Sequence, residues 1–169
     1  VALCDVYGPH LDEASERAPS ADRYTDFRHV IDRSDIDAVI IGTPDHWHAI
    51  PMVMACQSGK DVYVEKPSSR TVSEGRAMVR VARETDRIVQ VGTQQRTANI
   101  YQRAVEIIQS GGIGRVATVR TWNTYRGDPA GMGNPADSAP PPTLDWDMWL
   151  GPAPSVPYNV NKYNSWRRF

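Results

Sequence analysis

The tripeptide Glu65-Lys66-Pro67 is the local feature of the sequence best suited to chemistry. It directly follows Asp61-Val62-Tyr63-Val64, a run with the pattern of a buried strand. Because the residue before a proline has a restricted backbone, the Lys66 ammonium would point into the crevice at the strand end, where it can orient and polarise a substrate oxygen. For the tripeptide alone, a solvated ion pair at a strand end is the simpler interpretation.

The segment from Gly42 to His48 places two imidazoles at a tight turn after another strand. A metal site is not expected, because His46 and His48 are two positions apart at a turn and do not converge on one ion. The alternative is a loop in which Asp45 or Thr43 caps the following helix. Helix N-termini also attract phosphates, so capping and cofactor contact can coexist.

Asp5 is the carboxylate near the end of the first short apolar run of the chain, Val1 to Val6. At the end of a second Rossmann strand, a carboxylate accepts hydrogen bonds from both ribose hydroxyls of NAD and repels the 2′-phosphate of NADP. The alternative is a solvated loop carboxylate or a helix cap. The Gly-rich phosphate-binding turn that belongs about 20 residues earlier is not in the chain. A start inside a strand and a Trp-bearing end without a core predict truncation at both ends.

Alternating strand and helix patterns must position these groups. The β-branched run Ala38 to Gly42 is typical of a central strand covered on both faces. Thr71 and Glu74 have capping-box spacing, and Gly59 can close the preceding helix. The succession predicts an α/β fold with a doubly wound parallel Rossmann sheet whose first strand and Gly-rich turn are missing. Further strands are expected at 1–6, 21–24, 61–65 and 88–91, and helices at 12–17, 26–33, 48–58, 71–85 and 99–110.

A change of texture after Gly114 indicates a domain boundary. Arg115 to Tyr125 has the β-branched and aromatic residues of a longer strand, and Gly127 to Thr143 is rich in Pro, Gly and Ala with little periodicity. We therefore expect a partial dinucleotide-binding domain over residues 1–114 and the start of an α/β C-terminal domain over residues 115–169.

The composition excludes several classes of protein. With 169 residues, 19 Lys and Arg, 20 Asp and Glu and a formal net charge of −1, the chain lacks the positive field that nucleic acid or anionic lipid requires. The longest apolar run, Ala49 to Cys56, is far shorter than the roughly 20 residues of a membrane span. Cys4 and Cys56 are expected to be buried free thiols. We expect a cytoplasmic protein with a small-molecule ligand.

Four motifs, taken in order, carry a family resemblance. At these spacings the sequence resembles the Gfo/Idh/MocA family of NAD(P)-dependent oxidoreductases, over essentially the whole chain. The motifs are Ala38-Val39-Ile40-Ile41-Gly42-Thr43-Pro44-Asp45-His46-Trp47-His48-Ala49, Ser58-Gly59-Lys60-Asp61-Val62-Tyr63-Val64-Glu65-Lys66-Pro67, Val91-Gly92-Thr93-Gln94-Gln95-Arg96 and Trp146-Asp147-Met148-Trp149-Leu150-Gly151-Pro152-Ala153-Pro154.

The resemblance implies an N-terminal NAD(P)-binding Rossmann domain and a C-terminal α/β domain whose open sheet covers the nicotinamide. Lys66 would be the catalytic lysine that contacts the substrate oxygen, with Glu65 and Pro67 positioning it. Gln94 and Arg96 would face the active-site crevice. The cofactor would contact Asp5, Thr43, Pro44, His48, Glu65, Lys66, Pro67, Gln94, Trp166 and Arg167, and the substrate would contact Lys66 and Arg96.

The implied reaction is hydride transfer between NAD and a secondary alcohol or ketone of a sugar or polyol, with NADP disfavoured by Asp5. Three alternatives stay open: an NAD-dependent glycosidase of the same family, a non-catalytic protein that binds a dinucleotide or a sugar, and an unstable gene fragment with no function on its own. The family's acid/base Asp and His pair would fall after Phe169, so the isolated chain is expected to hold only part of an active site. The full-length protein is expected to form a homo-oligomer.

Overall fold

The computed structural model describes residues 1–122 and 131–168. The chain forms two compact units, one of residues 1–92 with 135–169 and one of residues 93–134, and each is described by itself. The domain boundary near Gly114 stays a prediction.

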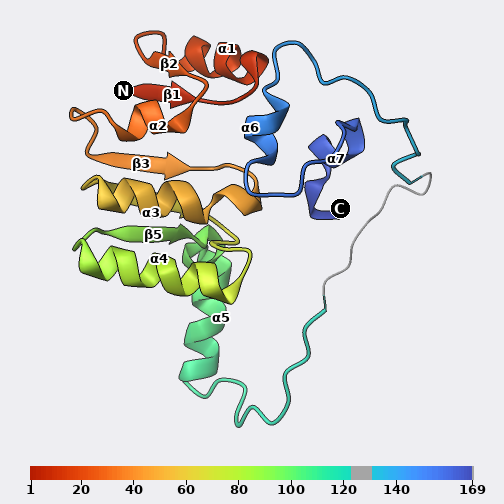
Figure 1. Ribbon diagram of the computed structural model, residues 1–169. Helices are drawn as coiled ribbons and strands as arrows, with labels where there is room; N and C mark the ends of the chain where they lie inside the picture. The colour runs from red at the N-terminus through yellow and green to blue at the C-terminus, as the bar shows by residue number, and fades with distance from the viewer. Residues whose placement is uncertain (123–130, 169) are drawn as a thin grey trace. The chain divides into compact units, whose positions relative to one another are not determined.

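The strands of the first unit are short and parallel (Figure 1). β1 (Ala2–Cys4) pairs with β2 (Asp22–Tyr24). β4 (Asp61–Glu65) lies between β3 (Ala38–Ile41) and β5 (Val89–Gly92). These parallel strands and the helices that cover them confirm the predicted α/β Rossmann class.

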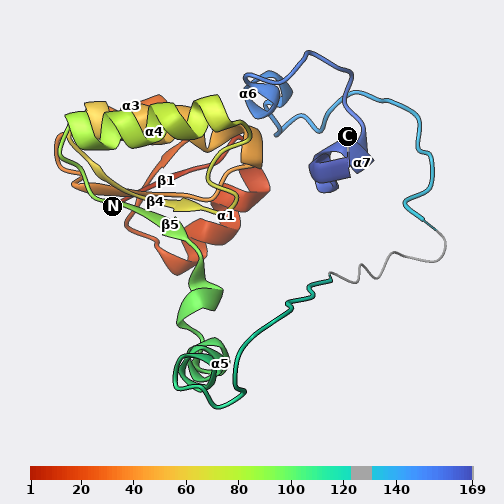
Figure 2. The same cartoon turned by 90° about the horizontal axis from the view of Figure 1, so that it is seen from below.

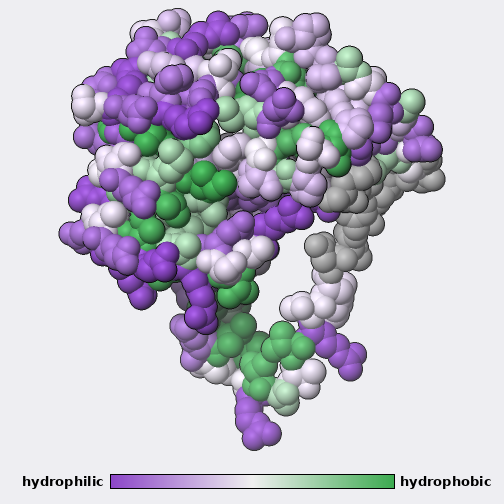
Figure 3. Space-filling model, in the orientation of Figure 1, coloured by the Kyte–Doolittle hydropathy of each residue, from purple (hydrophilic) through white to green (hydrophobic). Residues whose placement is uncertain are grey.

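The strands fall into two sheets, because no described ladder joins β1 to β3. Ile40 on β3 is 82% exposed. Hydrophobic residues reach the surface in this part of the unit (Figure 3). The space between β1 and β3 at their carboxyl ends is the cavity described below.

Helices cover both faces of the strands. α3 and α4 pack side by side on one face, and α1 lies on the other (Figure 2). Right-handed crossovers place helices on both faces of a parallel sheet when successive strands are added first toward one edge and then toward the other. The helices are α1 (Gly8–Arg17), α2 (Phe27–Ile31), α3 (Ala49–Gln57), α4 (Val72–Glu84), α6 (Trp146–Leu150) and α7 (Val160–Asn164), with short 3-10 turns η1 (Asp45–Trp47) and η3 (Trp166–Arg168).

Local signals set where these helices begin and end. The Thr71 hydroxyl accepts the Glu74 N–H at 3.2 Å and the Glu74 carboxylate accepts the Thr71 N–H at 2.9 Å, which forms the predicted capping box of α4. Gly59 adopts φ 78° after α3, a conformation that favours glycine. Pro51 lies in the first turn of α3, where its missing N–H costs no helix hydrogen bond.

Two hydrophobic cores hold the first unit together. One packs α3 against β4 and α4 through Met52, Cys56, Val64 and Met78, each at most 5% exposed. The other surrounds α6, so the tryptophans of this helix are buried within the unit. It consists of Leu144, Trp146, Trp149, Leu150 and Tyr158.

The second unit contains η2 (Gln94–Thr97) and α5 (Asn99–Gln109). α5 forms as predicted, and its apolar residues Ile100 and Val105 are 76% and 46% exposed. The predicted strand at 115–125 is wrong for residues 115–122, which form no strand, while residues 123–125 lie outside the described part. A β-branched run becomes a strand only beside a hydrogen-bonded neighbour, and no described segment pairs with this one.

The two cysteines differ in environment. Cys56 is buried, as predicted, and burial raises the pKa of its thiol. The prediction of a buried thiol is wrong for Cys4, which is exposed because it lies where β1 borders the cavity. Within the described ranges, no helix has the length and apolar character needed to cross a membrane.

Candidate active site

A cavity of about 570 Å³ opens between the carboxyl ends of β1 and β3. Asp5 and Val6 line it after β1, and Gly42, Thr43 and Pro44 line it after β3. Ligands bind at such strand ends in open α/β sheets, and this volume is typical of small-molecule sites. The structure thus brings together the predicted site residues Asp5, Thr43 and Pro44.

The Asp5 carboxylate is oriented by the segment that follows it. Its Oδ1 accepts the Tyr7 N–H at 2.9 Å, and its Oδ2 lies 3.2 Å from Nδ1 of His10. The Asp5 side chain is still 37% exposed. Because each carboxylate oxygen has a second lone pair, Asp5 can also accept hydrogen bonds from a ligand in the cavity.

Tyr163, which was not predicted from the sequence, enters the same cavity from α7. Burial first, and the nearby Asp5 carboxylate second, raise the pKa of Tyr163 to about 12. The phenol therefore keeps its hydrogen at neutral pH and can donate to a ligand oxygen. No local motif marks this residue, because only the packing of α7 brings it to the cavity.

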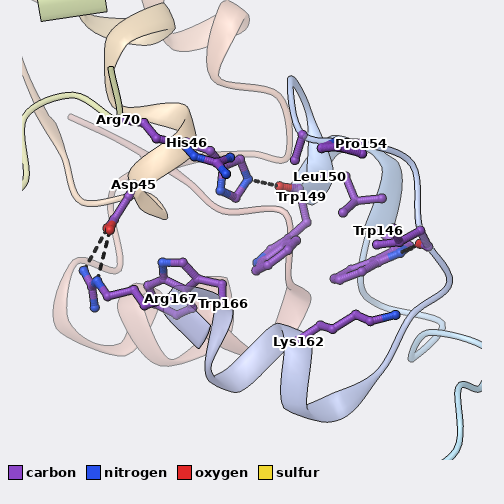
Figure 4. A pocket seen from close by; sticks show the side chains of 12 residues that line it. Asp45, His46, Arg70, Trp146, Trp149, Leu150, Pro154, Lys162, Trp166 and Arg167 are labelled. Atoms are coloured by element: carbon purple, nitrogen blue, oxygen red, sulfur yellow. Dashed lines mark hydrogen bonds and ion pairs between the residues drawn. The ribbon is translucent and has the colours of Figure 1, made fainter. Parts of the chain in front are cut away.

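A second cavity of about 610 Å³ lies beside α6 and the C-terminal segment (Figure 4). Trp166 and Arg167, both predicted to reach the cofactor, line it, and Trp166 also lines the first cavity. Arg167 donates to the Asp45 carboxylate from Nε at 3.0 Å and from Nη2 at 2.8 Å. The predicted Trp-Arg pair therefore meets the turn that follows β3.

Two aromatic side chains of η1 hold α6 beside this turn. Nε2 of His46 lies 2.9 Å from the Trp149 carbonyl, and Nε1 of Trp47 donates to the Met148 carbonyl at 2.9 Å. Burial lowers the pKa of His46 and so favours its neutral form.

In the part of the chain that the structure describes, no three His, Cys, Asp or Glu side chains gather as metal ligands.

The Lys66 side chain, which follows β4, is exposed and lines neither cavity. The backbone N–H of Lys66 donates to Oε2 of Glu65 at 3.1 Å, and the Lys66–Pro67 peptide bond is cis. The predicted position of the ammonium in a crevice at the strand end therefore gains no support from these two cavities. Its catalytic role stays a prediction, as do the positioning roles of Glu65 and Pro67.

His48 is the predicted cofactor contact whose position differs most from expectation. Its side chain is 1% exposed and lines neither cavity. Nδ1 lies 2.5 Å from the Pro67 carbonyl oxygen and Nε2 lies 2.8 Å from the Thr43 carbonyl oxygen. His48 is also the N-cap residue of α3, so the expected cap by Asp45 or Thr43 does not form. The His48 ring thus contacts two loops, and its predicted contact with the cofactor stays a prediction.

Gln94 and Arg96 belong to η2 of the second unit, where both are exposed. Their predicted contacts with cofactor and substrate stay predictions.

The sequence matches one protein family over residues 1–93, an oxidoreductase family with an NAD-binding Rossmann fold. The matched range includes both strands that border the first cavity and the Glu65-Lys66-Pro67 tripeptide. This chain belongs to the Gfo/Idh/MocA oxidoreductase family. The resemblance predicted from the four motifs is thereby confirmed.

Individual relatives of this Gfo/Idh/MocA chain match less than its full length. Levoglucosan dehydrogenase of Pseudarthrobacter phenanthrenivorans is 34% identical over 116 residues, 69% of this chain and 29% of that protein. Glycosyl hydrolase family 109 protein 1 of a Shewanella species is 36% identical over 95 residues, 51% of this chain and 21% of that protein.

One solved structure also matches part of this chain. The crystal structure of scyllo-inositol dehydrogenase from Lactobacillus casei, with bound NAD(H) and scyllo-inositol, has a TM-score of 0.63 and 27% identity, and the match covers 67% of this chain and 34% of that one. The chain thus spans between about a fifth and a third of the length of these three proteins.

Proposed function

We propose that this chain supplies the NAD-binding part of an oxidoreductase that acts on a secondary alcohol or ketone of a sugar or polyol. The observation that carries the proposal is the cavity at the carboxyl ends of β1 and β3, which Asp5 and the Thr43-Pro44 turn line together. This is where an open, parallel α/β sheet binds its ligand. Membership of an oxidoreductase family with an NAD-binding fold supports the choice of ligand.

The residues of the cavity suit NAD. Asp5 would accept hydrogen bonds from the ribose hydroxyls, and its charge would repel the 2′-phosphate of NADP. A Cβ atom built on Gly42 meets no atom within 4 Å, so the cofactor has room to approach the backbone there. Tyr163 and Trp166 would contact it from the C-terminal segment.

Lys66 is the residue we propose to act on the substrate. When bound, NAD takes up the hydride that leaves the alcohol carbon. The Lys66 ammonium would donate a hydrogen bond to the alcohol oxygen and stabilise the negative charge that develops as a base takes the hydroxyl proton. Since this charge is larger in the transition state than in the neutral alcohol, the interaction lowers the barrier.

The relatives support a sugar or polyol as the substrate. One is named levoglucosan dehydrogenase, and the Lactobacillus casei structure holds scyllo-inositol beside NAD(H). Levoglucosan is a sugar derivative and scyllo-inositol is a cyclic polyol, and both carry secondary alcohols. We propose that the substrate of this protein belongs to the same chemical class.

A second candidate function is an NAD-dependent glycosidase, because the Shewanella glycosyl hydrolase family 109 protein is 36% identical over 95 residues. Such an enzyme oxidises its sugar transiently, eliminates the glycosidic group and reduces the sugar again. NAD is regenerated in that cycle. A dehydrogenase therefore accumulates NADH as substrate is consumed, whereas a glycosidase releases its leaving group with no net change in NADH absorbance.

Calorimetric titration of the whole protein with NAD tests the proposed cofactor site. We expect saturable binding that Gly42→Val weakens at least about tenfold, because a side chain there blocks the approach of the cofactor to the backbone. Ser20→Val, an exposed substitution outside the cavity, should leave the affinity unchanged. A folded protein that binds no NAD would overturn the proposal.

A further inference from the structure

His48 occupies a buried position between two loops of the candidate active site. Its side chain is 1% exposed, with Nδ1 2.5 Å from the Pro67 carbonyl oxygen and Nε2 2.8 Å from the Thr43 carbonyl oxygen. Thr43 lies in the loop after β3, and Pro67 directly follows Lys66 in the loop after β4. One imidazole therefore contacts two of the loops that carry predicted site residues.

The hydrogen-bonding chemistry of the imidazole suits this place. Carbonyl oxygens only accept hydrogen bonds, and a buried carbonyl that loses its donor destabilises the fold. A neutral imidazole has one N–H and an imidazolium has two, so the His48 ring donates to at least one of the two loops in either state. The contact from Nδ1 to the Pro67 carbonyl oxygen is the shorter of the two, so we expect the N–H of a neutral ring to be on Nδ1.

The His48 ring is carried by a rigid element. His48 is the N-cap residue of α3, and its carbonyl accepts the Met52 N–H at 3.4 Å. Met52 and Cys56 of the same helix, 1% and 0% exposed, lie in the core that includes residues of β4 and α4. A hydrogen bond from this ring to the Pro67 carbonyl therefore anchors the loop after β4 to α3 and its closely packed core.

Lys66 lies between two fixed points of the backbone. On one side, the pairing of β4 with β5 reaches Glu65, which is in register with Gly92. On the other side, the Pro67 carbonyl is bound by His48. Because a single residue separates these points and a proline restricts the residue before it, the Cα of Lys66 has little freedom to move.

We propose that His48 is a positioning residue, which holds the Lys66-Pro67 loop against the Thr43 turn so that the Lys66 ammonium meets the substrate oxygen. The role given to Lys66 rests on the proposed function. The attachment of the loop rests on the contacts of the two His48 ring nitrogens with the Pro67 and Thr43 carbonyl oxygens. His48 thus acts on the reaction through Lys66, without touching the cofactor.

Amide hydrogen exchange tests the attachment of the loop. His48→Leu keeps the apolar bulk of the ring but has no donor, whereas Cys56→Ala disturbs the same helix two turns further on, within the core. We expect His48→Leu to speed exchange of the Lys66 and Arg70 N–H groups, which donate to the Glu65 and Glu74 carboxylates, at least about ten times more than exchange in β4, and Cys56→Ala to speed both regions alike. His48→Gln, which keeps an N–H donor, should restore part of the protection.

Two outcomes of these measurements would overturn the proposal. One is equal acceleration of the loop and of β4 in His48→Leu, because His48 would then be an ordinary core residue. Should His48→Leu not fold, the unsubstituted protein decides the matter by NMR. We expect a slowly exchanging hydrogen on Nδ1 of His48, and a ring without a protected N–H is the second contradicting outcome.

Turnover measurements on the whole protein test the action through Lys66. We expect His48→Leu to lower kcat roughly 10- to 100-fold with little change in KM for NAD, since misplacing a catalytic group costs this much. In a Lys66→Met background, the same substitution should cost nothing further. A further loss in that background would overturn the proposal. If Lys66→Met alone leaves turnover unchanged, the proposed function fails, and the exchange measurement still decides whether His48 holds the loop.

Discussion

Arg167 holds the Asp45 carboxylate with two hydrogen bonds across 122 positions of sequence, from Nε at 3.0 Å and from Nη2 at 2.8 Å. The Asp45 side chain is 19% exposed and that of Arg167 is 56% exposed. The pair joins the C-terminal Trp166-Arg167 segment to the turn after β3, so residues far apart in the sequence line one cavity.

Removal of this ion pair should loosen the C-terminal segment. Asp45→Asn and Arg167→Gln should each lower the free energy of unfolding, and a double-mutant cycle should give a coupling of about 1 kcal/mol, the upper end for a solvent-screened pair. The exposed pair Arg103 and Glu106 on α5 is the control, with coupling near zero. Urea denaturation measures both cycles, and equal coupling in the two would contradict the special role of the Arg167 pair.

Gly151, which follows α6, has no room for a side chain. Its φ is 49°, and a Cβ atom there would lie 2.0 Å from Cζ2 of Trp47. Gly151→Ala should therefore lower the free energy of unfolding by about 3 kcal/mol, through backbone strain and overpacking. Gly59→Ala is the control, because its φ is 78° but nothing lies within 4 Å, and it should cost only about 1 kcal/mol. Similar losses in thermal or urea unfolding would show that the clash with Trp47 is absent.

Acid should weaken the contact between η1 and α6. Burial, the main cause, places the pKa of His46 in the folded protein below its ordinary value. Such a group stabilises the fold above its ordinary pKa of about 6.5, and that contribution is lost as the pH falls through the folded value. The free energy of unfolding should thus fall as the pH falls below about 7, and His46→Gln should remove part of this fall. His29→Gln changes an exposed residue of α2 and should leave this fall unchanged. If the free energy of unfolding depends on pH identically in the unsubstituted protein, His46→Gln and His29→Gln, the prediction is refuted.

Asp5 should decide which cofactor binds. In the proposed cofactor site its charge repels the 2′-phosphate of NADP, so NAD should bind at least about tenfold more tightly than NADP, and Asp5→Ser should narrow the difference in affinity. Asp12→Ser removes a carboxylate of α1 outside the cavity and should leave the preference unchanged. Comparable affinities for the two cofactors in the unsubstituted protein would contradict this assignment.

Elements with a local signal could be predicted from the sequence. The capping box at Thr71 and Glu74 marks the start of α4, and Pro51 and Gly59 bracket α3, because each acts on the backbone within a few residues of itself. The strand predicted from residue 115 lacked such support, since a strand depends on a neighbour elsewhere in the chain.

The contacts that shape the site could be predicted only in part. The strand-end rule correctly placed Asp5, Thr43 and Pro44 around one cavity. It could not show Tyr163 beside Asp5, because that proximity depends on the packing of a distant helix. Nor could it show that His48 turns inward, because the direction of its ring depends on two carbonyls from separate loops.

Steady-state turnover of Lys66→Met in the whole protein tests the proposed chemistry most directly. The exposed Lys66 side chain adds little to packing, so the variant should melt at the normal temperature and bind NAD normally. Arg80→Met, which removes a cation from the exposed face of α4, is the control for loss of charge and should turn over normally. For Lys66→Met we predict that kcat and kcat/KM fall together, by roughly 10²- to 10⁴-fold. Near-normal turnover by a well-folded Lys66→Met protein would contradict the assignment of Lys66 as the catalytic residue.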